Sequence, residues 1–277
     1  MTMSSVMDPL LEQVEKIVRE VGLFQMKHFR KVSLNAEGLK AVRETVSFVD
    51  VESERLLKEG LMALKDGVGF YGEESGQEGS QYLAWVVDPL DGTTNYLSGM
   101  DHFSISVGLV EDGKSILGLV HKPSTGESLG AVKGEGCWRL DARHAKGWEI
   151  MKKPNVDLPT KEALFMTGFP YRSEDLEGPF FATAPEVLKL GLGIRRSGSA
   201  ALDLSYLGMG WLQGFWESDL QPYDVAAALL MMEEHGIKAT NEIGQPYSMM
   251  KDRILVAGLP KVHSDLLKIV AQHYRLG

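Results

Sequence analysis

Cysteine is nearly absent from this chain: Cys137 is the only one among 277 residues. A single cysteine excludes an intramolecular disulfide, and it excludes a zinc site built from a cluster of thiolates. Long apolar runs are missing as well. The longest, Val225–Met232, covers 8 residues, whereas a membrane-spanning helix needs about 20. With no secretory pattern at the start, we expect a cytoplasmic protein without a membrane partner.

Positive charge is also in short supply, with 29 Lys and Arg residues against 38 Asp and Glu residues and a net charge of −9. Such a surface repels polyanions on average, so we expect no nucleic-acid partner. A small phosphorylated substrate is compatible with this balance, because a bound metal ion can reverse the local field. The hydrophobic share of 44% is ordinary for a globular protein and excludes a disordered or collagen-like chain.

The spacing of apolar residues predicts an alternation of helices and strands. Helices are expected from Pro9 onward and over residues 51–66, 185–190, 200–208, 224–235 and 262–273. Strands are expected over residues 83–87, 103–110, 116–120, 129–132, 137–140, 164–167 and 254–257. Polar or Gly-rich composition predicts loops at 33–47 and 71–80. The polar segment 141–160, with two prolines, predicts a boundary between a domain at 1–145 and a second at 146–277.

Residues 108–115 match the phosphate-loop pattern G-x-x-x-x-G-K-[ST]. That motif requires a helix after it, whereas residues 116–120 have the apolar character of a short strand. The dipeptide Asp112-Gly113 is instead a strong signal for a hairpin turn. We therefore predict a β-hairpin at this position and no nucleotide site.

Acidic residues form three clusters at the borders of apolar segments: Glu73-Glu74, Asp88 with Asp91, and Asp224. Each cluster also has an ordinary structural explanation, which is a solvated loop, a turn and a helix cap, respectively. Together they offer oxygen ligands only, which favour Mg²⁺ or Mn²⁺ over zinc. Two or three such ions held close together are a common device for hydrolysing a phosphate ester with water.

The sequence around these clusters resembles the inositol monophosphatase family, a group of Mg²⁺-dependent, lithium-sensitive phosphatases. The run WVVDPLDGTTNY at 85–96 is similar to the family's W-x-x-D-P-x-D-G-T-x-N-F. PYDVAAALLMMEEHG at 222–236 is similar to its W-D-x-A-A/G-…-E-A-G-G, and GEES at 72–75 matches outright. The resemblance implies an α/β fold, a five-layer αβαβα sandwich with a large antiparallel sheet in its N-terminal half and the site between the two halves.

The resemblance also implies roles for single residues. One metal ion would be held by Glu73, Asp88 and the carbonyl of Leu90, and another by Asp88, Asp91 and Asp224. Catalytic roles would fall on Glu73, Thr93, Asp50 and Asp91, with Asp50 hydrogen-bonded to Thr93. Substrate would be bound by Gly92, Thr93, Asp91, Gly198, Ser199, Ala200 and Glu217. The cofactor would be Mg²⁺, with two or three ions per site, or Mn²⁺.

Asp50 belongs to a segment that resembles the family's D-L-V-T-x-x-D, with Glu44 and Ser47 as replacements for Asp and Thr. The polar stretch before it, residues 33–45, would form a mobile lid that becomes ordered when metal binds. The resemblance further implies inhibition by lithium and assembly as a homodimer.

The implied reaction is hydrolysis of a small phosphate monoester by metal-activated water, with myo-inositol 1-phosphate as the first candidate. Glu217 stands seven residues before Asp224, at the distance of the family's inositol-reading glutamate. Arg172, Arg195 and Arg196 are candidates for a second phosphate, as in fructose 1,6-bisphosphate or a phosphoadenosine phosphate, or for surface ion pairs. Histidinol phosphate is another family substrate that stays open. A non-catalytic regulatory or scaffold protein of the same fold is the alternative from a different class.

Overall fold

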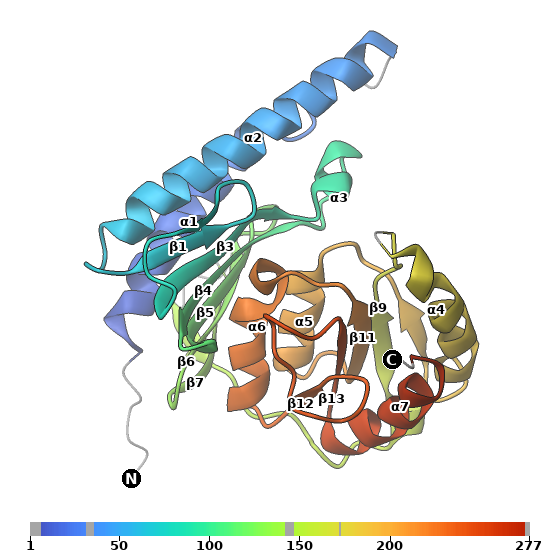
Figure 1. Ribbon diagram of the computed structural model, residues 1–277. Helices are drawn as coiled ribbons and strands as arrows, with labels where there is room; N and C mark the ends of the chain where they lie inside the picture. Colours follow the sequence, from blue (N-terminus) through green and yellow to red (C-terminus); the bar gives the residue numbers. More distant parts are fainter. Residues whose placement is uncertain (1–6, 32–35, 142–146, 172, 275–277) are drawn as a thin grey trace.

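The computed structural model describes residues 7–31, 36–141, 147–171 and 173–274, with the backbone alone over 36–47. Its elements stack in five layers (Figure 1). Two helices cover one face of an eight-stranded sheet, two lie between this sheet and a five-stranded one, and two cover the far face of the second sheet. In that order they are α1 (Pro9–His28) and α2 (Ala36–Met62), α5 (Ala200–Gly208) and α6 (Pro222–Glu234), and α4 (Glu174–Val187) and α7 (Pro260–His273). The expected αβαβα sandwich is confirmed.

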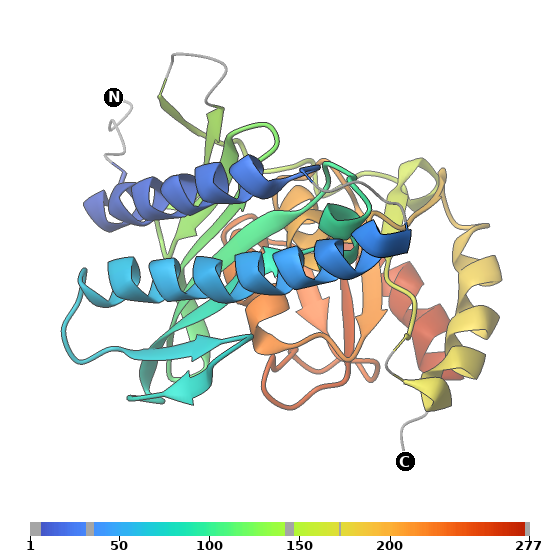
Figure 2. The same ribbon diagram turned by 90° about the horizontal axis from the view of Figure 1, so that it is seen from above.

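The first layer holds α1 and α2, which run side by side over the sheet (Figure 2). Helix α1 begins at Pro9 as predicted, and the Asp8 side chain caps it by accepting a hydrogen bond from the Leu10 amide (2.7 Å). The loop predicted at 33–47 is wrong from residue 36 onward, where α2 begins. That segment has no proline, and Gly38 alone does not prevent a helix among good helix formers. Residues 33–35 of the expected lid lie outside the described part of the chain.

The eight-stranded sheet has the order β2-β1-β3-β4-β5-β6-β7-β8, and every neighbouring pair except β1 with β3 is antiparallel. Its strands are β1 (Gly69–Gly72), β2 (Gly76–Glu78), β3 (Leu83–Asp91), β4 (Ser104–Glu111), β5 (Lys114–Lys122), β6 (Glu127–Val132), β7 (Gly136–Asp141) and β8 (Trp148–Ile150). Strands β1 and β2 replace part of the predicted loop at 71–80, because strands this short carry no periodic signal. The domain boundary expected at 145/146 falls on residues outside the described part.

The match to the phosphate-loop pattern forms the predicted hairpin between β4 and β5. Asp112 and Gly113 connect the two strands with positive φ angles of 47° and 73°, as a two-residue hairpin turn requires. Strand β5 follows directly where a phosphate loop would need a helix. The structure therefore agrees with the rejection of a nucleotide site here.

Small residues bring α6 close to the first sheet and thereby fix the position of Asp224. A Cβ built on Gly108 would lie 2.8 Å from the Ala226 Cβ, and one on Gly118 would lie 2.2 Å from the carbonyl oxygen of Ala227. Side chains at either glycine would therefore push the helix away from the sheet. Helix α6 begins at Pro222, earlier than predicted, so Asp224 lies within its first turn.

The five-stranded sheet has the order β10-β9-β11-β13-β12. Its strands are β9 (Leu164–Thr167), β10 (Gly193–Arg195), β11 (Gly214–Ser218), β12 (Lys238–Thr240) and β13 (Ile254–Gly258). The helix predicted at 185–190 overlaps α4 only over 185–187, because α4 starts at Glu174, with acidic residues in its first turn, and ends at Val187. Two short helices complete the fold, α3 (Thr93–Leu97) and a 3₁₀ turn at Thr160–Glu162. Within the described residues, no helix is both long and apolar enough to cross a membrane.

Candidate active site

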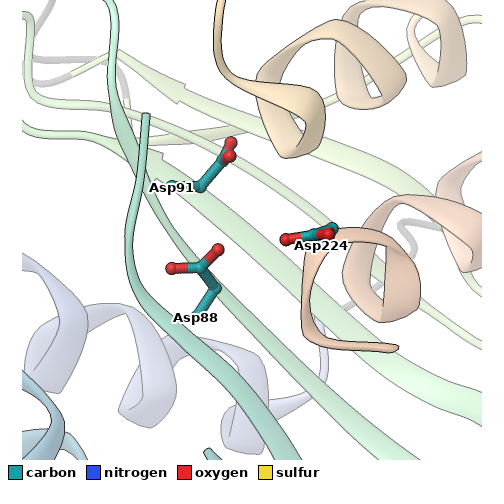
Figure 3. Close-up of side chains that lie close together, drawn as sticks. All are labelled: Asp88, Asp91 and Asp224. Carbon is teal, nitrogen blue, oxygen red and sulfur yellow. The ribbon is translucent and has the colours of Figure 1, made fainter. Parts of the chain in front are cut away.

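Three carboxylates from two layers converge at one end of the first sheet. Asp88 and Asp91 come from β3, Asp224 comes from the first turn of α6, and their side chains point toward one another (Figure 3). One oxygen of each lies within 4.8 Å of the others. The structure thus brings together three of the metal ligands that the resemblance implied, from positions far apart in the sequence.

A bulge in β3 places Asp88 and Asp91 on the same side of the strand. Residues three apart on a regular strand point to opposite faces. Opposite β3, however, Asp88 pairs with Ser106 and Asp91 with Ser104, so β3 carries one extra residue between these pairs. That residue reverses the alternation locally. Pro89 suits the bulge because it has no N–H group to donate to the sheet. The Asp88 carboxylate accepts a hydrogen bond from the Leu90 amide (2.9 Å).

Asp224 is held in place by its own helix and by the neighbouring sheet. Its carboxylate accepts a hydrogen bond from the Gln221 amide (2.7 Å) as half of a capping box. One residue earlier, the Tyr223 carbonyl accepts a hydrogen bond from Ser106 on β4 (3.1 Å). The helix start is therefore anchored to the strand beside the one that carries Asp88 and Asp91.

Crowding of negative charge makes this cluster a good fit for a cation. Burial raises the pKa of Asp88 well above its usual range, and the nearby Asp91, Glu73 and Asp224 raise it further. Burial likewise raises the pKa of Asp91, against the hydrogen bonds that it accepts. Asp88 is 2% exposed and Asp91 is 8% exposed, so water does little to stabilise their charges. A hard divalent ion with oxygen ligands supplies that stabilisation.

Asp91 also connects β3 to the start of α5. Its carboxylate accepts hydrogen bonds from the hydroxyls of Ser104 and Ser199 and from the amides of Ala200 (3.2 Å) and Ala201 (2.9 Å). Ser199 is the N-cap of α5. The segment expected to read substrate hydroxyls is therefore positioned by a residue of the carboxylate cluster.

Gly92 and Thr93 form the turn that follows β3. Gly92 has a φ of 92°, and a Cβ at this position would lie 3.1 Å from the carbonyl oxygen of Gly198, so a glycine suits both the conformation and the space. The Thr93 hydroxyl donates to the Leu90 carbonyl (3.0 Å). The expected hydrogen bond to Asp50 is not formed; the side chains of Glu44 and Ser47 lie outside the described part of the chain.

Asp50 lies on α2, beneath the acidic loop at 72–75. It is buried, and burial together with Glu74 and Glu73 raises its pKa to about 8. Asp50 does not line the cavity described next. Asp50 is therefore linked to the site only by its electrostatic interaction with Glu73 and Glu74.

A cavity of about 570 Å³ opens over the cluster. Of the residues expected at the site, those that line it are Glu73, Asp88, Leu90, Asp91, Gly92, Thr93, Gly198, Ser199, Ala200, Glu217 and Asp224. The cavity adds residues that no sequence argument assigned, namely Thr94, Thr167, Gly168, Phe169, Pro170, Tyr171, Ser173, Asp203, Ser218, Asp219 and Leu220. Two sequence runs, TGFPY at 167–171 and RSGSAALD at 196–203, contain six of these residues and are the signal that could have found them.

Glu217 and Asp203 add two acidic side chains to the cavity lining. Burial raises the pKa of Glu217 well above its usual range, and Asp203 and Asp224 raise it further. A Cβ on Gly168 would lie 1.7 Å from Glu217 Oε1, so only a glycine leaves room for this carboxylate. Asp203 accepts a hydrogen bond from the Ser197 hydroxyl.

The three arginines considered for a second phosphate have different positions. Arg196 is the only basic residue among the described residues that line the cavity, and its guanidinium lies 5.2 Å from the ring centre of Tyr171. Arg195 is exposed and donates to the Ile194 carbonyl (3.1 Å). Arg172 lies outside the described residues. The described part of the cavity thus offers one guanidinium rather than a basic cluster.

Comparison with known proteins identifies the class to which this fold and site belong. Residues 6–275 match the inositol monophosphatase family, and the chain belongs to this family. It is 36% identical over 239 residues to a protein named inositol-1-monophosphatase from Rhizobium meliloti, covering 85% of this chain and 86% of that one. It is 31% identical over 263 residues to a protein named Nus factor SuhB from Pasteurella multocida, covering 94% and 95%. A solved structure of the extragenic suppressor protein suhB from Bartonella henselae superposes with a TM-score of 0.80 at 28% identity, covering 94% and 98%.

Proposed function

We propose that this protein is a Mg²⁺-dependent phosphomonoesterase that hydrolyses a small polyol phosphate, with myo-inositol 1-phosphate as the substrate. The observation that carries this proposal is the meeting of Asp88, Asp91 and Asp224 in one cavity, with ligand atoms within 4.8 Å of one another. Buried acidic side chains are rarely left together without a cationic partner. The family membership supports the same reaction class.

Five residues supply the oxygen donors of the proposed metal site. Glu73, Asp88 and the Leu90 carbonyl would hold one ion, and Asp88, Asp91 and Asp224 another; all of them line the cavity. When bound, the ions would supply positive charge to the phosphate oxygens and acidify water for attack on phosphorus.

The chain's own groups then position the reactants. Gly92 and Thr93 line the cavity beside Asp91, and their amides would bind phosphate oxygens. The Thr93 hydroxyl, already fixed on the Leu90 carbonyl, would share the attacking water with Glu73. Phosphoryl transfer depends mainly on such positioning and on charge stabilisation.

The acidic side chains of Glu217 and Asp203 in the cavity lining favour a neutral, hydroxyl-rich leaving group. Glu217 and Asp203 offer carboxylate acceptors for hydroxyl groups. A second phosphate would have to approach these acidic residues with Arg196 as the one described basic residue in the lining. Histidinol phosphate, whose leaving group carries an amine, also suits an acidic wall, so substrate choice needs a direct test.

A panel of four esters tests the substrate: myo-inositol 1-phosphate, fructose 1,6-bisphosphate, histidinol phosphate and 3′-phosphoadenosine 5′-phosphate. We expect phosphate release with Mg²⁺ to be fastest, by kcat/KM, for the inositol ester. Glu217→Gln should lower that preference by raising KM, whereas Glu149→Gln, at an exposed position on β8, should not. Faster release from a bisphosphate would contradict the polyol assignment.

A scaffold role is the second candidate, favoured by the relative named Nus factor SuhB. A chain that served only as a scaffold would not need its metal ligands, yet the five donor positions are retained and gathered in one cavity. We therefore place catalysis first. Absence of phosphate release from all four esters would reverse this order.

A further inference from the structure

A buried carboxylate lies beneath the acidic loop at 72–75 and has no role so far. Glu54, on α2, is 4% exposed. Its two oxygens accept hydrogen bonds from successive amides of the loop, Oε2 from Glu74 and Oε1 from Ser75, each at 2.8 Å. Both oxygens thus accept hydrogen bonds from the amides of the two residues that directly follow Glu73.

Gly72 makes room for this carboxylate. A Cβ built on Gly72 would lie 2.2 Å from Glu54 Oε2 and 2.5 Å from its carboxyl carbon. Any side chain at this position would displace Glu54 from the loop. The glycine and the two amides after Glu73 together form a cradle for the Glu54 side chain.

The cradle fixes the loop between two rigid elements. On one side, Gly72 ends β1, which pairs in parallel with β3, the strand that carries Asp88. The Glu73 amide also donates to the Val87 carbonyl on β3 (3.3 Å). On the other side, Glu54 extends from α2, in which the nearby residues Ser53 and Leu57 are fully buried. Glu73 therefore stands between a strand contact at its own amide and a helix contact at the next two amides.

Glu54 is the fourth acidic side chain in this region, after Asp50, Glu73 and Glu74. Hydrogen bonds from amides to a carboxylate are strong and directional, and they define the path of the backbone. What this arrangement provides is a fixed orientation of the loop.

We propose that Glu54 is a positioning residue that holds the 72–75 loop so that Glu73 can bind the metal ion beside Asp88. The proposal rests on the metal site proposed above. Glu54 itself does not line the cavity and acts only through the backbone of the loop. Groups that orient a ligand in this way commonly change metal affinity by about 10- to 100-fold when they are replaced.

Binding of Mn²⁺ to the full-length chain, followed by electron paramagnetic resonance, tests this proposal without substrate. Glu54→Gln keeps the shape, but its amide group turns a donor toward one of the two N–H groups. We expect its Mn²⁺ dissociation constant to rise by about 10-fold or more. The matched control, Glu59→Gln, lies on the same helix with a side chain that is 73% exposed, and its dissociation constant should equal that of the wild type.

A second variant, Gly72→Ala, keeps the Glu54 carboxylate but changes its position. Gly72→Ala should push the Glu54 carboxylate away and weaken Mn²⁺ binding as well, and it decides the matter alone if Glu54→Gln does not fold by circular dichroism. In phosphate release, both variants should need more Mg²⁺ for half-maximal rate while kcat at saturating Mg²⁺ stays near that of the wild type. A general loss of folding would not separate the two quantities in this way.

The outcomes are distinct. Wild-type Mn²⁺ affinity in the folded variants would overturn the role of Glu54 and leave the proposed function intact. Tight Mn²⁺ binding by the wild type without phosphate release from any ester would overturn the proposed function and leave the positioning role in place. Absence of Mn²⁺ binding by the wild type would overturn both.

Discussion

At the scale of single residues, Asp91 has two structural tasks: it belongs to the carboxylate cluster, and it accepts hydrogen bonds from the first two amides of α5. Replacing it with Asn would turn an amide donor toward groups that already donate to it, the Ser199 hydroxyl and the Ala201 amide. We expect Asp91→Asn to abolish phosphate release and to lower the free energy of unfolding by about 1–3 kcal/mol. Urea unfolding and a phosphate assay on the same preparation measure both effects.

Asp224→Asn is the matched comparison, because the remaining oxygen of Asn can still accept the Gln221 amide. This variant should lose activity without losing stability, since it removes one charge from a repelling cluster. Equal activity of either folded variant and the wild type would refute the assignment of these carboxylates.

Replacing Gly168 tests whether Glu217 contacts the substrate. A Cβ there would lie 1.7 Å from Glu217 Oε1, so Gly168→Ala must displace the Glu217 side chain. Losing one hydrogen bond to a substrate hydroxyl should raise KM for the inositol ester up to about 10-fold with kcat little changed. Steady-state kinetics measures the change.

Gly178→Ala is the control for that variant. Gly178 is exposed within α4, and a Cβ added there would meet no other atom within 4 Å. Its replacement should leave KM unchanged and stabilise the protein by up to about 1 kcal/mol. An unchanged KM in Gly168→Ala as well would argue against a substrate role for Glu217.

At the scale of elements, His121 joins α1 to the first sheet. Its ring on β5 hydrogen-bonds the Ser128 hydroxyl on β6 (2.8 Å) and lies against Gly22 of α1. Burial, with a smaller effect from Arg19, lowers the pKa of His121 from 6.5 to about 4. Between these pH values the unfolded chain therefore binds more protons than the folded one. The contribution of neutral His121 to the free energy of unfolding is thus complete above pH 6.5 and is lost as the pH falls toward 4.

The resulting prediction compares the wild type with His121→Asn, which keeps a polar partner for Ser128. Between pH 7.5 and pH 5, the wild type should lose about 2 kcal/mol more of its unfolding free energy than the variant. Urea unfolding at the two pH values provides the numbers. Identical pH dependence in the two proteins would mean that His121 is not held neutral by the α1–sheet junction.

At the scale of the whole molecule, the proposed metal ions would connect two layers of the sandwich. Asp88 and Asp91 belong to the first sheet and Asp224 to the helices between the sheets. Binding to the folded state alone should therefore stabilise the protein by about 2.7 kcal/mol at an ion concentration 100-fold above the dissociation constant. We expect Mn²⁺ to raise the melting temperature by about 5 °C, and this shift should vanish in Asp224→Asn. Calorimetry with and without EDTA measures the shift.

The three clustered carboxylates could be predicted from the sequence, because Asp88, Asp91 and Asp224 stand in motifs of consecutive residues. The bulge that turns Asp88 and Asp91 to one side of β3 depends on pairing with β4 and has no local signal. Glu54 has none either: it occupies an ordinary position in a helical pattern, and its role depends on a loop about 20 residues away folding over it.

Errors in the predicted elements have similar physical causes. The helix start predicted at residue 185 is too late, because α4 begins at Glu174 and contains both Pro179 and Pro185. Polar composition does not exclude a helix over 36–47, because Lys, Arg and Glu are good helix formers. Lithium inhibition, the homodimer and the position of the domain boundary stay predictions.

The measurement that bears most directly on the central claim is phosphate release from myo-inositol 1-phosphate by the wild-type protein during removal and return of Mg²⁺. Release with Mg²⁺, loss of release with excess EDTA, and recovery when Mg²⁺ is added back are the results that the carboxylate cluster predicts. Release that is unaffected by EDTA, or no release with Mg²⁺ present, would contradict it.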